Sequence, residues 1–312
     1  MRHDSTTPET RLATRLAQEG WAWRAVSARR AQELWAEIEE RRRDGAFDDA
    51  FFEERLAPFA AHCASPPEEM PTLLILAVPD PWTRLRFTWH RETVETWIPP
   101  TFLGWREAET RALEAIRDAG PWQVASAPVP KKLLAARSGL ARYGRNNVTY
   151  VPEHGSYVRL ISLYTDIPLQ ETRWDEPATL AHCAGCGACV AACPAAALDD
   201  DRFLVHAERC LTFWNEKPRE IPFPDSIPAA AHHCLLGCAR CQEVCPANAG
   251  ARRDRDAGEP FTEDQTQELL AATTEDRLSP TLREALRRQG LLEALETLPR
   301  NLTALLRDET PT

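Results

Sequence analysis

Nine of the ten cysteines lie between Cys183 and Cys245, and most of them stand in C-x2-C pairs. The first array, CAGCGACVAACP, has the spacing C-x2-C-x2-C-x3-C-P, and the second array reads GCARCQEVCPAN. Thiolates at such spacings bind metal, and the first run is typical of iron–sulfur clusters. A pair of zinc sites also uses C-x2-C pairs and remains the alternative, although this spacing is not usual in zinc ribbons.

The cysteine before each proline indicates how the ligands are shared. In bacterial-type ferredoxins, which the first run resembles, this cysteine ligates the other cluster. We therefore expect two [4Fe-4S] clusters, one held by Cys183, Cys186, Cys189 and Cys245, and the other by Cys193, Cys210, Cys238 and Cys241. Cys234 is surplus, and is either a buried free thiol or the ligand that replaces Cys210. Cys63, alone in AAHCASPP, is interpreted as a packing residue.

The composition limits the partners of the chain. Its 312 residues carry a formal net charge of -10, which argues against a general affinity for nucleic acid or anionic membranes. The first ten residues are polar and precede no apolar stretch of a signal peptide, and the longest apolar run, LLILAV, is far too short to span a membrane. We expect a cytoplasmic protein without a membrane partner.

The elements that must position these residues form three segments, 1–175, 176–250 and 251–312. The first segment is predicted to be an α/β domain. It contains a helix from Ser27, a buried strand at LLILAV, a hairpin in TRLRFTWHRETVETWIP, a helix over 105–119 and strands in NNVTYV and SYVRLISLYT. The second segment holds the cysteine arrays, and the third is a helical tail that we expect to pack on the body.

One stretch of this acidic chain is basic, because several cations between Pro121 and Thr165 face a single acid, Glu153. An anion site is therefore expected in this stretch. The cations are Lys131, Lys132, Arg137, Arg142, Arg145 and Arg159.

Glycine and asparagine residues gather in the same stretch. Gly139 and Gly144, with Asn146 and Asn147, would let the backbone approach a flat cofactor or a phosphate closely. The same residues are equally typical of a turn, so the residues alone leave both interpretations open. His154, before a glycine, is more typical of a turn than of a cofactor contact.

Five motifs in this order resemble the epoxyqueuosine reductase family: SAP at Ser126, GLARYGRNN at Gly139, HGSY at His154, TDIPL at Thr165, and the cysteine pattern through CPAN. The resemblance is widest from about residue 126 to residue 248. It implies an α+β protein, in which an N-terminal α/β, cobalamin-reductase-like domain precedes a bacterial-ferredoxin-like two-cluster domain and a short helical tail.

The resemblance also implies a reaction. Two [4Fe-4S] clusters would pass electrons to a cofactor, cobalamin, or to a substrate held by the N-terminal domain. The implied partner is an electron donor such as a flavodoxin or a ferredoxin reductase. The implied cofactor contacts are Ser126, Gly139, Gly144, Arg145, Asn146 and His154.

The sequence departs from this family at the proton donor. The family has an aspartate in a VDSAP-like motif, whereas this motif reads VASAP and places Ala125 there. Alanine cannot donate a proton, so we nominate Tyr143 as the catalytic donor. The lost aspartate, the acidic charge and the short segment after Cys245 argue against tRNA as the substrate. We expect a cobalamin-dependent reductase whose substrate need not be a tRNA and can be a small molecule; a corrinoid-free electron-transfer or reductive-activation protein and tRNA epoxyqueuosine reduction itself are the alternatives.

Overall fold

The computed structural model describes residues 7–307, so the first six residues of the polar N-terminal segment and the last five of the predicted tail lie outside it. The described chain forms two compact units. Unit 1 comprises the residues up to Pro79 and Trp105–Gly187, and unit 2 comprises Asp80–Gly104 and the residues from Ala188 on.

These units cut the chain differently from the predicted segments, which divided it at residues 175 and 250. The hairpin within Asp80–Gly104 groups with the C-terminal helices, because its apolar residues share one buried core with theirs. The predicted domain boundaries themselves stay a prediction.

Unit 1 is built on a four-stranded sheet of order β1-β2-β8-β5, in which every pair is antiparallel. The run LLILAV lies in β2, as predicted, but β1 was not predicted: the expected helix from Ser27 begins only at Arg30, because Ser27 is the last residue of β1 and pairs with Thr72. The strands are β1 (Ala22–Ser27), β2 (Thr72–Pro79), β5 (Val124–Ser126) and β8 (Val158–Thr165), and β6 (Arg142–Tyr143) and β7 (Thr149–Tyr150) form a separate ribbon.

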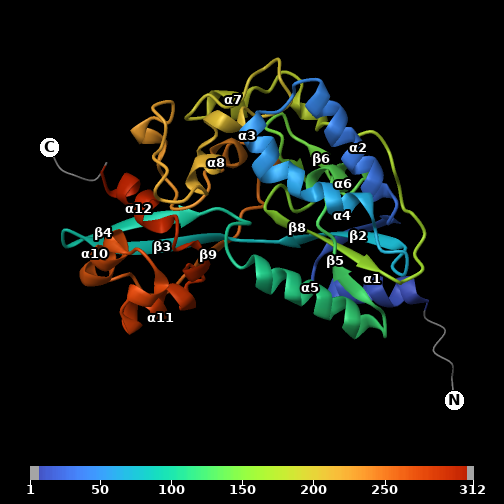
Figure 1. Ribbon diagram of the computed structural model, residues 1–312, viewed down its shortest axis with the longest axis horizontal. Helices are drawn as coiled ribbons and strands as arrows, with labels where there is room; N and C mark the ends of the chain where they lie inside the picture. Colours follow the sequence, from blue (N-terminus) through green and yellow to red (C-terminus); the bar gives the residue numbers. More distant parts are fainter. Residues whose placement is uncertain (1–6, 308–312) are drawn as a thin grey trace. The chain divides into compact units, whose positions relative to one another are not determined.

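Helices cover both faces of this sheet (Figure 1). Alternate residues of β2 enter two different cores: Leu73 and Ile75 pack with α2, α4 and α6, whereas Leu74 and Leu76 pack with α1 and α5. Each such fully buried aliphatic side chain stabilises the fold by about 1.5–3 kcal/mol. The helices are α1 (Pro8–Gln18), α2 (Arg30–Arg43), α3 (Asp49–Phe51), α4 (Ala60–Ala64), α5 (Trp105–Ala119) and α6 (Lys131–Arg137), with a π-helical turn at Phe52–Leu56.

Unit 2 has a three-stranded sheet of order β4-β3-β9 against which the C-terminal helices pack. The predicted hairpin is confirmed as β3 and β4, and Phe87 of β3 stacks on Phe261 with ring centroids 4.8 Å apart. The elements are β3 (Trp82–Trp89), β4 (Glu92–Ile98), β9 (Asp254–Asp256), α10 (Glu263–Ala271), α11 (Pro280–Arg288) and α12 (Leu298–Arg307). The predicted helical tail is thus part of the core of unit 2.

The cysteine region of unit 2 is held by short elements. Within the described chain, the helices between residues 188 and 250 are α7 (Ala188–Ala191), α8 (Leu211–Asn215) and α9 (Arg240–Glu243), with single 3-10 turns between them. The backbone of Cys234 and Leu235 attaches this region to β4. Cys234 forms an isolated parallel β-bridge with Trp97, and the Leu235 N–H donates to the Trp97 carbonyl at 3.1 Å. Among the described residues, none of the helices is both long and apolar enough to cross a lipid bilayer.

Candidate metal centre and active site

Three of the four cysteines predicted for the second cluster, Cys193, Cys210 and Cys238, influence one another electrostatically in unit 2. The pKa of Cys238 is raised to about 12, chiefly by burial; the Arg240 N–H lowers it, and the negative charges that Cys210 and Cys193 would carry contribute to the rise. Burial also raises the pKa of Cys210, to which Cys193 again contributes. Each thiol therefore lies within electrostatic range of the others, from segments that are far apart in the sequence.

Backbone N–H groups point at these sulfur atoms. The Ala197 N–H donates to Cys193 Sγ at 3.2 Å, and the N–H groups of Thr212 and Phe213, at the start of α8, donate to the Cys210 thiol. Such donors stabilise the charge of an iron-bound thiolate and tune the cluster potential. These N–H donors suit iron-bound thiolates, while the ligand set itself stays a prediction from the spacing.

Cys238 and Cys241 lie on either side of the start of α9. Ala239 between them has a left-handed backbone, with φ of 56°, and the Arg240 N–H donates to the Cys238 thiol. Cys234 is 2% exposed, and its thiol donates to the Cys238 carbonyl at 3.6 Å, which supports the free-thiol interpretation.

The other predicted ligand set is divided between the units. Cys183 and Cys186 belong to the end of unit 1, where Gly185 and Gly187 have positive φ, and Cys189 and Cys245 belong to unit 2. This set stays a prediction from the spacing.

Outside both sets, Cys63 is fully buried in the unit 1 core, and burial raises its pKa to about 11. These two observations support its interpretation as a packing residue.

A polar group lies at the end of β5 in unit 1. Ser126 Oγ is hydrogen-bonded to a carboxylate oxygen of Glu109, which α5 supplies. The pKa of Lys131, at the start of α6, is lowered by desolvation and by the positive charge of Arg159, while the negative charge of Glu109 opposes this shift. A carboxylate, a hydroxyl and two cations thus influence one another at this place, and groups of these kinds can bind an anion and transfer a proton.

The GRNN motif forms the turn between β6 and β7. A Cβ on Gly144 would lie 2.5 Å from Asn146 Oδ1 and 2.6 Å from the Tyr150 ring, so only glycine fits there. Asn146 Nδ2 donates to the Tyr150 hydroxyl at 2.9 Å, and Lys132 Nζ donates to the Asn147 carbonyl at 3.0 Å. The structure accounts for these residues as a turn.

The other predicted contacts are spread over unit 1. Gly139 has φ of 70° and ends α6 against Arg173. Arg145 Nη2 donates to the Cys183 carbonyl at 3.1 Å, which links the GRNN turn to the first cysteine. His154 lies in the turn between Val151 and Gly155, as predicted for PEHG.

Tyr143, the nominated proton donor, is 6% exposed, and burial raises its pKa well above the usual value. Its backbone pairs with Ala178 and Leu180. Glu109 was not predicted from the sequence. Its position in α5, four residues after the exposed Trp105, gives no signal by itself, because its partner Ser126 comes from a different element.

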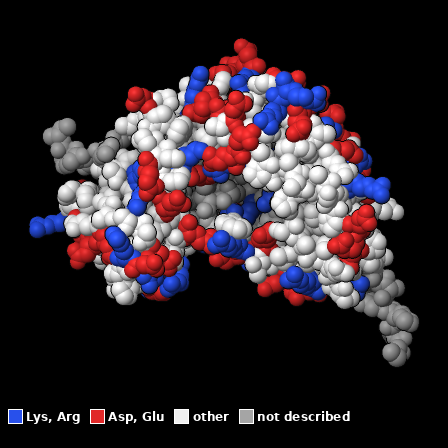
Figure 2. Space-filling model, in the orientation of Figure 1, with Lys and Arg blue, Asp and Glu red and all other residues white. Residues whose placement is uncertain are grey.

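Charged residues of both signs are interspersed over the face in Figure 2. Arg137, one of the cations of the basic stretch, forms ion pairs with Glu37 and Glu176 in unit 1. The basic character of this stretch is therefore partly used in ion pairs within the fold.

Comparison with known proteins identifies the type of domain in the cysteine region. Residues 182–248 match the family model described as a 4Fe-4S double cluster binding domain, which confirms the expectation of two [4Fe-4S] clusters rather than zinc. Epoxyqueuosine reductase of Synechococcus sp. (strain CC9605) is 36% identical over 125 residues, which are 40% of this chain and 37% of that protein. The enzyme of Pseudomonas aeruginosa is 31% identical over 183 residues, 56% of this chain and 48% of that protein. The chain thus spans less than half of the length of these curated relatives.

Solved structures extend the similarity in fold. The crystal structure of an epoxyqueuosine reductase with an epoxyqueuosine-modified tRNA-Tyr stem loop matches 96% of this chain and 80% of that chain, with a TM-score of 0.67 and 20% identity. The Bacillus subtilis enzyme, solved with its catalytic aspartate loop swung out of the active site, matches equally widely with a TM-score of 0.66 and 20% identity. The predicted α+β class and the resemblance to epoxyqueuosine reductases are confirmed.

Proposed function

We propose that this chain, an epoxyqueuosine reductase-like iron–sulfur protein, is a reductase that removes the epoxide oxygen of epoxyqueuosine in tRNA. One observation carries the proposal: a double-cluster domain lies in a chain whose fold matches, over 96% of its length, an enzyme solved with an epoxyqueuosine-modified stem loop. This takes up the tRNA alternative that the sequence argued against, because net charge reports on the whole surface whereas a modified stem loop is bound locally.

The reaction balances with two electrons and two protons. Both C–O bonds of the epoxide break, the two carbons become an alkene, and the oxygen leaves as water. The electrons come one at a time from a protein donor of the flavodoxin or ferredoxin reductase type, through the clusters. The chain must therefore hold the epoxide near a proton source and exclude other oxidants.

Cobalamin is the organic cofactor that the resemblance implies, and it would supply the two-electron chemistry at the epoxide. Two of its predicted contacts do not form a cradle for it, because Gly139 and Gly144 face the chain's own Arg173, Asn146 and Tyr150. We therefore assign no step to it.

Glu109 is our candidate proton donor. Its carboxylate is hydrogen-bonded to Ser126, the residue after Ala125. Helix α5 therefore supplies a carboxylate to the VASAP motif, which has alanine in place of the family's aspartate. Tyr143 stays the candidate predicted from the sequence, but its burial and raised pKa make it a weak acid at neutral pH. The partly exposed Glu109 is accessible to a substrate.

The test is an anaerobic turnover with cluster-reconstituted protein, reduced flavodoxin and an epoxyqueuosine-containing tRNA stem loop, with and without added cobalamin. Nucleoside digestion and mass spectrometry measure the loss of one oxygen atom. Conversion that requires the clusters supports the proposal, and its dependence on cobalamin decides whether that cofactor is used. Clusters that reduce and reoxidise without any conversion would overturn it and leave the electron-transfer alternative, which the alanine at position 125 favours.

A further inference from the structure

Side chains of α12 connect the two cysteine-bearing segments of the second cluster. Asn301 is 1% exposed, and its Nδ2 donates to the Asn215 carbonyl at 2.9 Å and to the Leu235 carbonyl at 3.0 Å. Asn215, which is fully buried, donates in turn from Nδ2 to the Gly237 carbonyl at 2.7 Å. Two buried amides therefore join the end of α8, which starts after Cys210, to the residue before Cys238.

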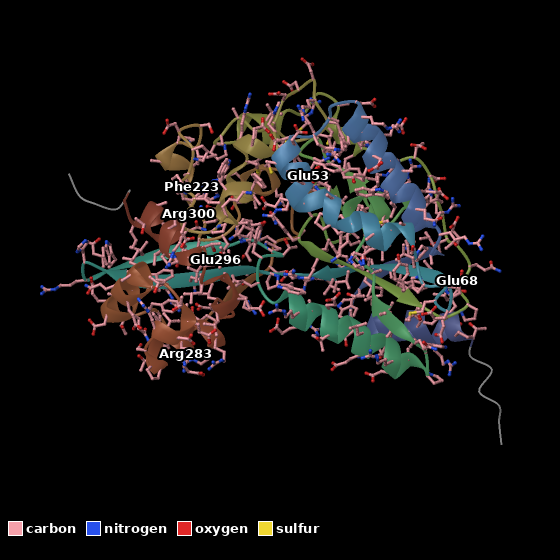
Figure 3. All side chains as sticks on the ribbon, viewed as in Figure 1. Glu53, Glu68, Phe223, Arg283, Glu296 and Arg300 are labelled. Carbon is pink, nitrogen blue, oxygen red and sulfur yellow. The ribbon has the colours of Figure 1, made fainter. Side chains whose placement is uncertain are left out.

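Arg300 fixes α12 to the end of α8 and to the segment that follows it. Its guanidinium donates to the Trp214 carbonyl at 2.6 Å and to the Ile221 carbonyl at 2.6 Å, and it lies 4.2 Å from the Phe223 ring centroid. Arg300 and Phe223 lie together in Figure 3. Arg300 also donates to Asn301 Oδ1 at 3.0 Å, so the amide of Asn301 is oriented with Nδ2 toward its two carbonyls.

The fold needs these donors because α8 is short. A helix of five residues cannot satisfy its last carbonyl groups internally, and the Trp214 and Asn215 carbonyls are such groups. Arg300 donates to the Trp214 carbonyl, which also accepts the Lys217 N–H at 3.1 Å, and Asn301 donates to the Asn215 carbonyl. The other end of α8 points the N–H groups of Thr212 and Phe213 at the Cys210 thiol, so a shift of α8 would move those donors too.

We propose that Arg300 and Asn301 are positioning residues that hold Cys210 relative to Cys238, and thereby set the occupancy and the potential of the second [4Fe-4S] cluster. The inference rests on the proposed ligand set but not on the substrate. The C-terminal helix is then part of the redox centre's support, and not only a cap on the core of unit 2.

The test compares Asn301→Leu with a matched control. Leucine keeps the approximate volume and removes both donors. Gln289→Leu is the control, because Gln289 is also a buried amide of the C-terminal segment (8% exposed), but donates to the Glu259 carbonyl, outside the cysteine segments. Both full-length variants are reconstituted anaerobically and measured for iron and sulfide per chain, for thermal stability, and for cluster potentials by a redox titration followed by electron paramagnetic resonance.

We expect the iron content of Asn301→Leu to fall from that of two clusters per chain toward that of one. If both clusters are kept, we expect the potential of one to shift while that of the other is unchanged. Gln289→Leu should keep both clusters and both potentials. Unchanged iron and potentials in Asn301→Leu, or equal losses in both variants, would overturn the inference. If Asn301→Leu does not fold, Arg300→Lys serves in its place, because lysine keeps the charge but cannot reach both carbonyls at once, and the same readouts decide.

These readouts separate this inference from the proposed reductase activity. Iron content and potential do not depend on any substrate, so the inference can fail while epoxyqueuosine is still reduced. Conversely, a chain that never converts the modified stem loop can still lose its second cluster when Asn301 is replaced.

Discussion

The sheet of unit 1 and the cysteine region of unit 2 keep their shapes by different means. Strand β2 is buried along its length and feeds two aliphatic cores. In the described part of the cysteine region the helices are short, and a small apolar cluster includes Cys238, one of the predicted ligands. The first region is specified by hydrophobic periodicity, and the second by thiolate spacing and side chain to backbone bonds. Metal–thiolate bonds therefore replace much of the apolar core that a segment of this size would otherwise need.

Removal of the clusters should have the largest effect, and should affect the cysteine region but not the sheet of unit 1. We expect metal-free protein to exchange its amide hydrogens between residues 188 and 250 on the order of a hundredfold faster than reconstituted protein, because ligand binding contributes directly to the folding free energy of that region. Amides of β2 and β8 should change little. Hydrogen exchange with mass spectrometry measures both. Equal protection of the cysteine region with and without iron would show that its side-chain bonds suffice.

The surplus cysteine gives the next largest effect. Cys210→Ser should lose one of the two clusters, whereas Cys234→Ala should keep both, because the Cys234 thiol donates to the Cys238 carbonyl. Iron and sulfide per chain are measured after anaerobic reconstitution. Two full clusters in Cys210→Ser, with a loss in Cys234→Ala, would exchange the roles of these two residues.

Chemistry in unit 1 is tested at Glu109. If this carboxylate donates a proton in the proposed reaction, Glu109→Gln should lower the rate of epoxyqueuosine conversion by about 10²–10⁴-fold without changing the iron content. Glu107→Gln, on the same helix and exposed to solvent, is the control and should keep the rate. A normal rate in Glu109→Gln together with a large loss in Tyr143→Phe would return the donor role to Tyr143.

Local patterns could be predicted from the sequence, whereas contacts between distant residues could not. The strand at LLILAV, the helix at 105–119 and the cysteine arrays are local patterns, and the structure has these elements where they were expected. Glu109 and Asn301 were missed because each acts through a partner far away in the sequence, Ser126 at 17 residues and Asn215 at 86 residues. Strand β1 was missed for the same reason, since its pairing with β2 crosses the intervening helices.

The glycine motif allowed two interpretations for a related reason. A positive φ and a close neighbour are properties that a cofactor site and an ordinary turn share, and at Gly144 the neighbours are Asn146 and Tyr150 of its own turn. The motif therefore predicted a turn correctly, but it could not show whether the turn also contacts a cofactor or a phosphate.

The smallest effect concerns the ion pairs that tie the loops of unit 1 to its sheet. Glu171 binds Arg30 at 2.6 Å and accepts the Ser27 N–H at 3.2 Å, and these bonds, Arg30 first, lower the pKa of Glu171. Because the folded-state pKa lies below the unfolded value, the stabilisation is complete above the unfolded pKa and is lost as the pH falls through the folded one.

Glu171→Gln should therefore reduce the free energy of unfolding by about 1 kcal/mol at neutral pH, and the difference from the unmodified protein should shrink below the usual glutamate pKa of 4.5. Glu176→Gln is the control, because its side chain is 86% exposed in its pair with Arg137, and it should change stability little. Denaturant unfolding across pH measures both variants. A difference for Glu171→Gln that persists unchanged into acid would mean that packing, and not the carboxylate charge, links this loop to β1, and unit 1 would then depend on apolar contacts even at its surface.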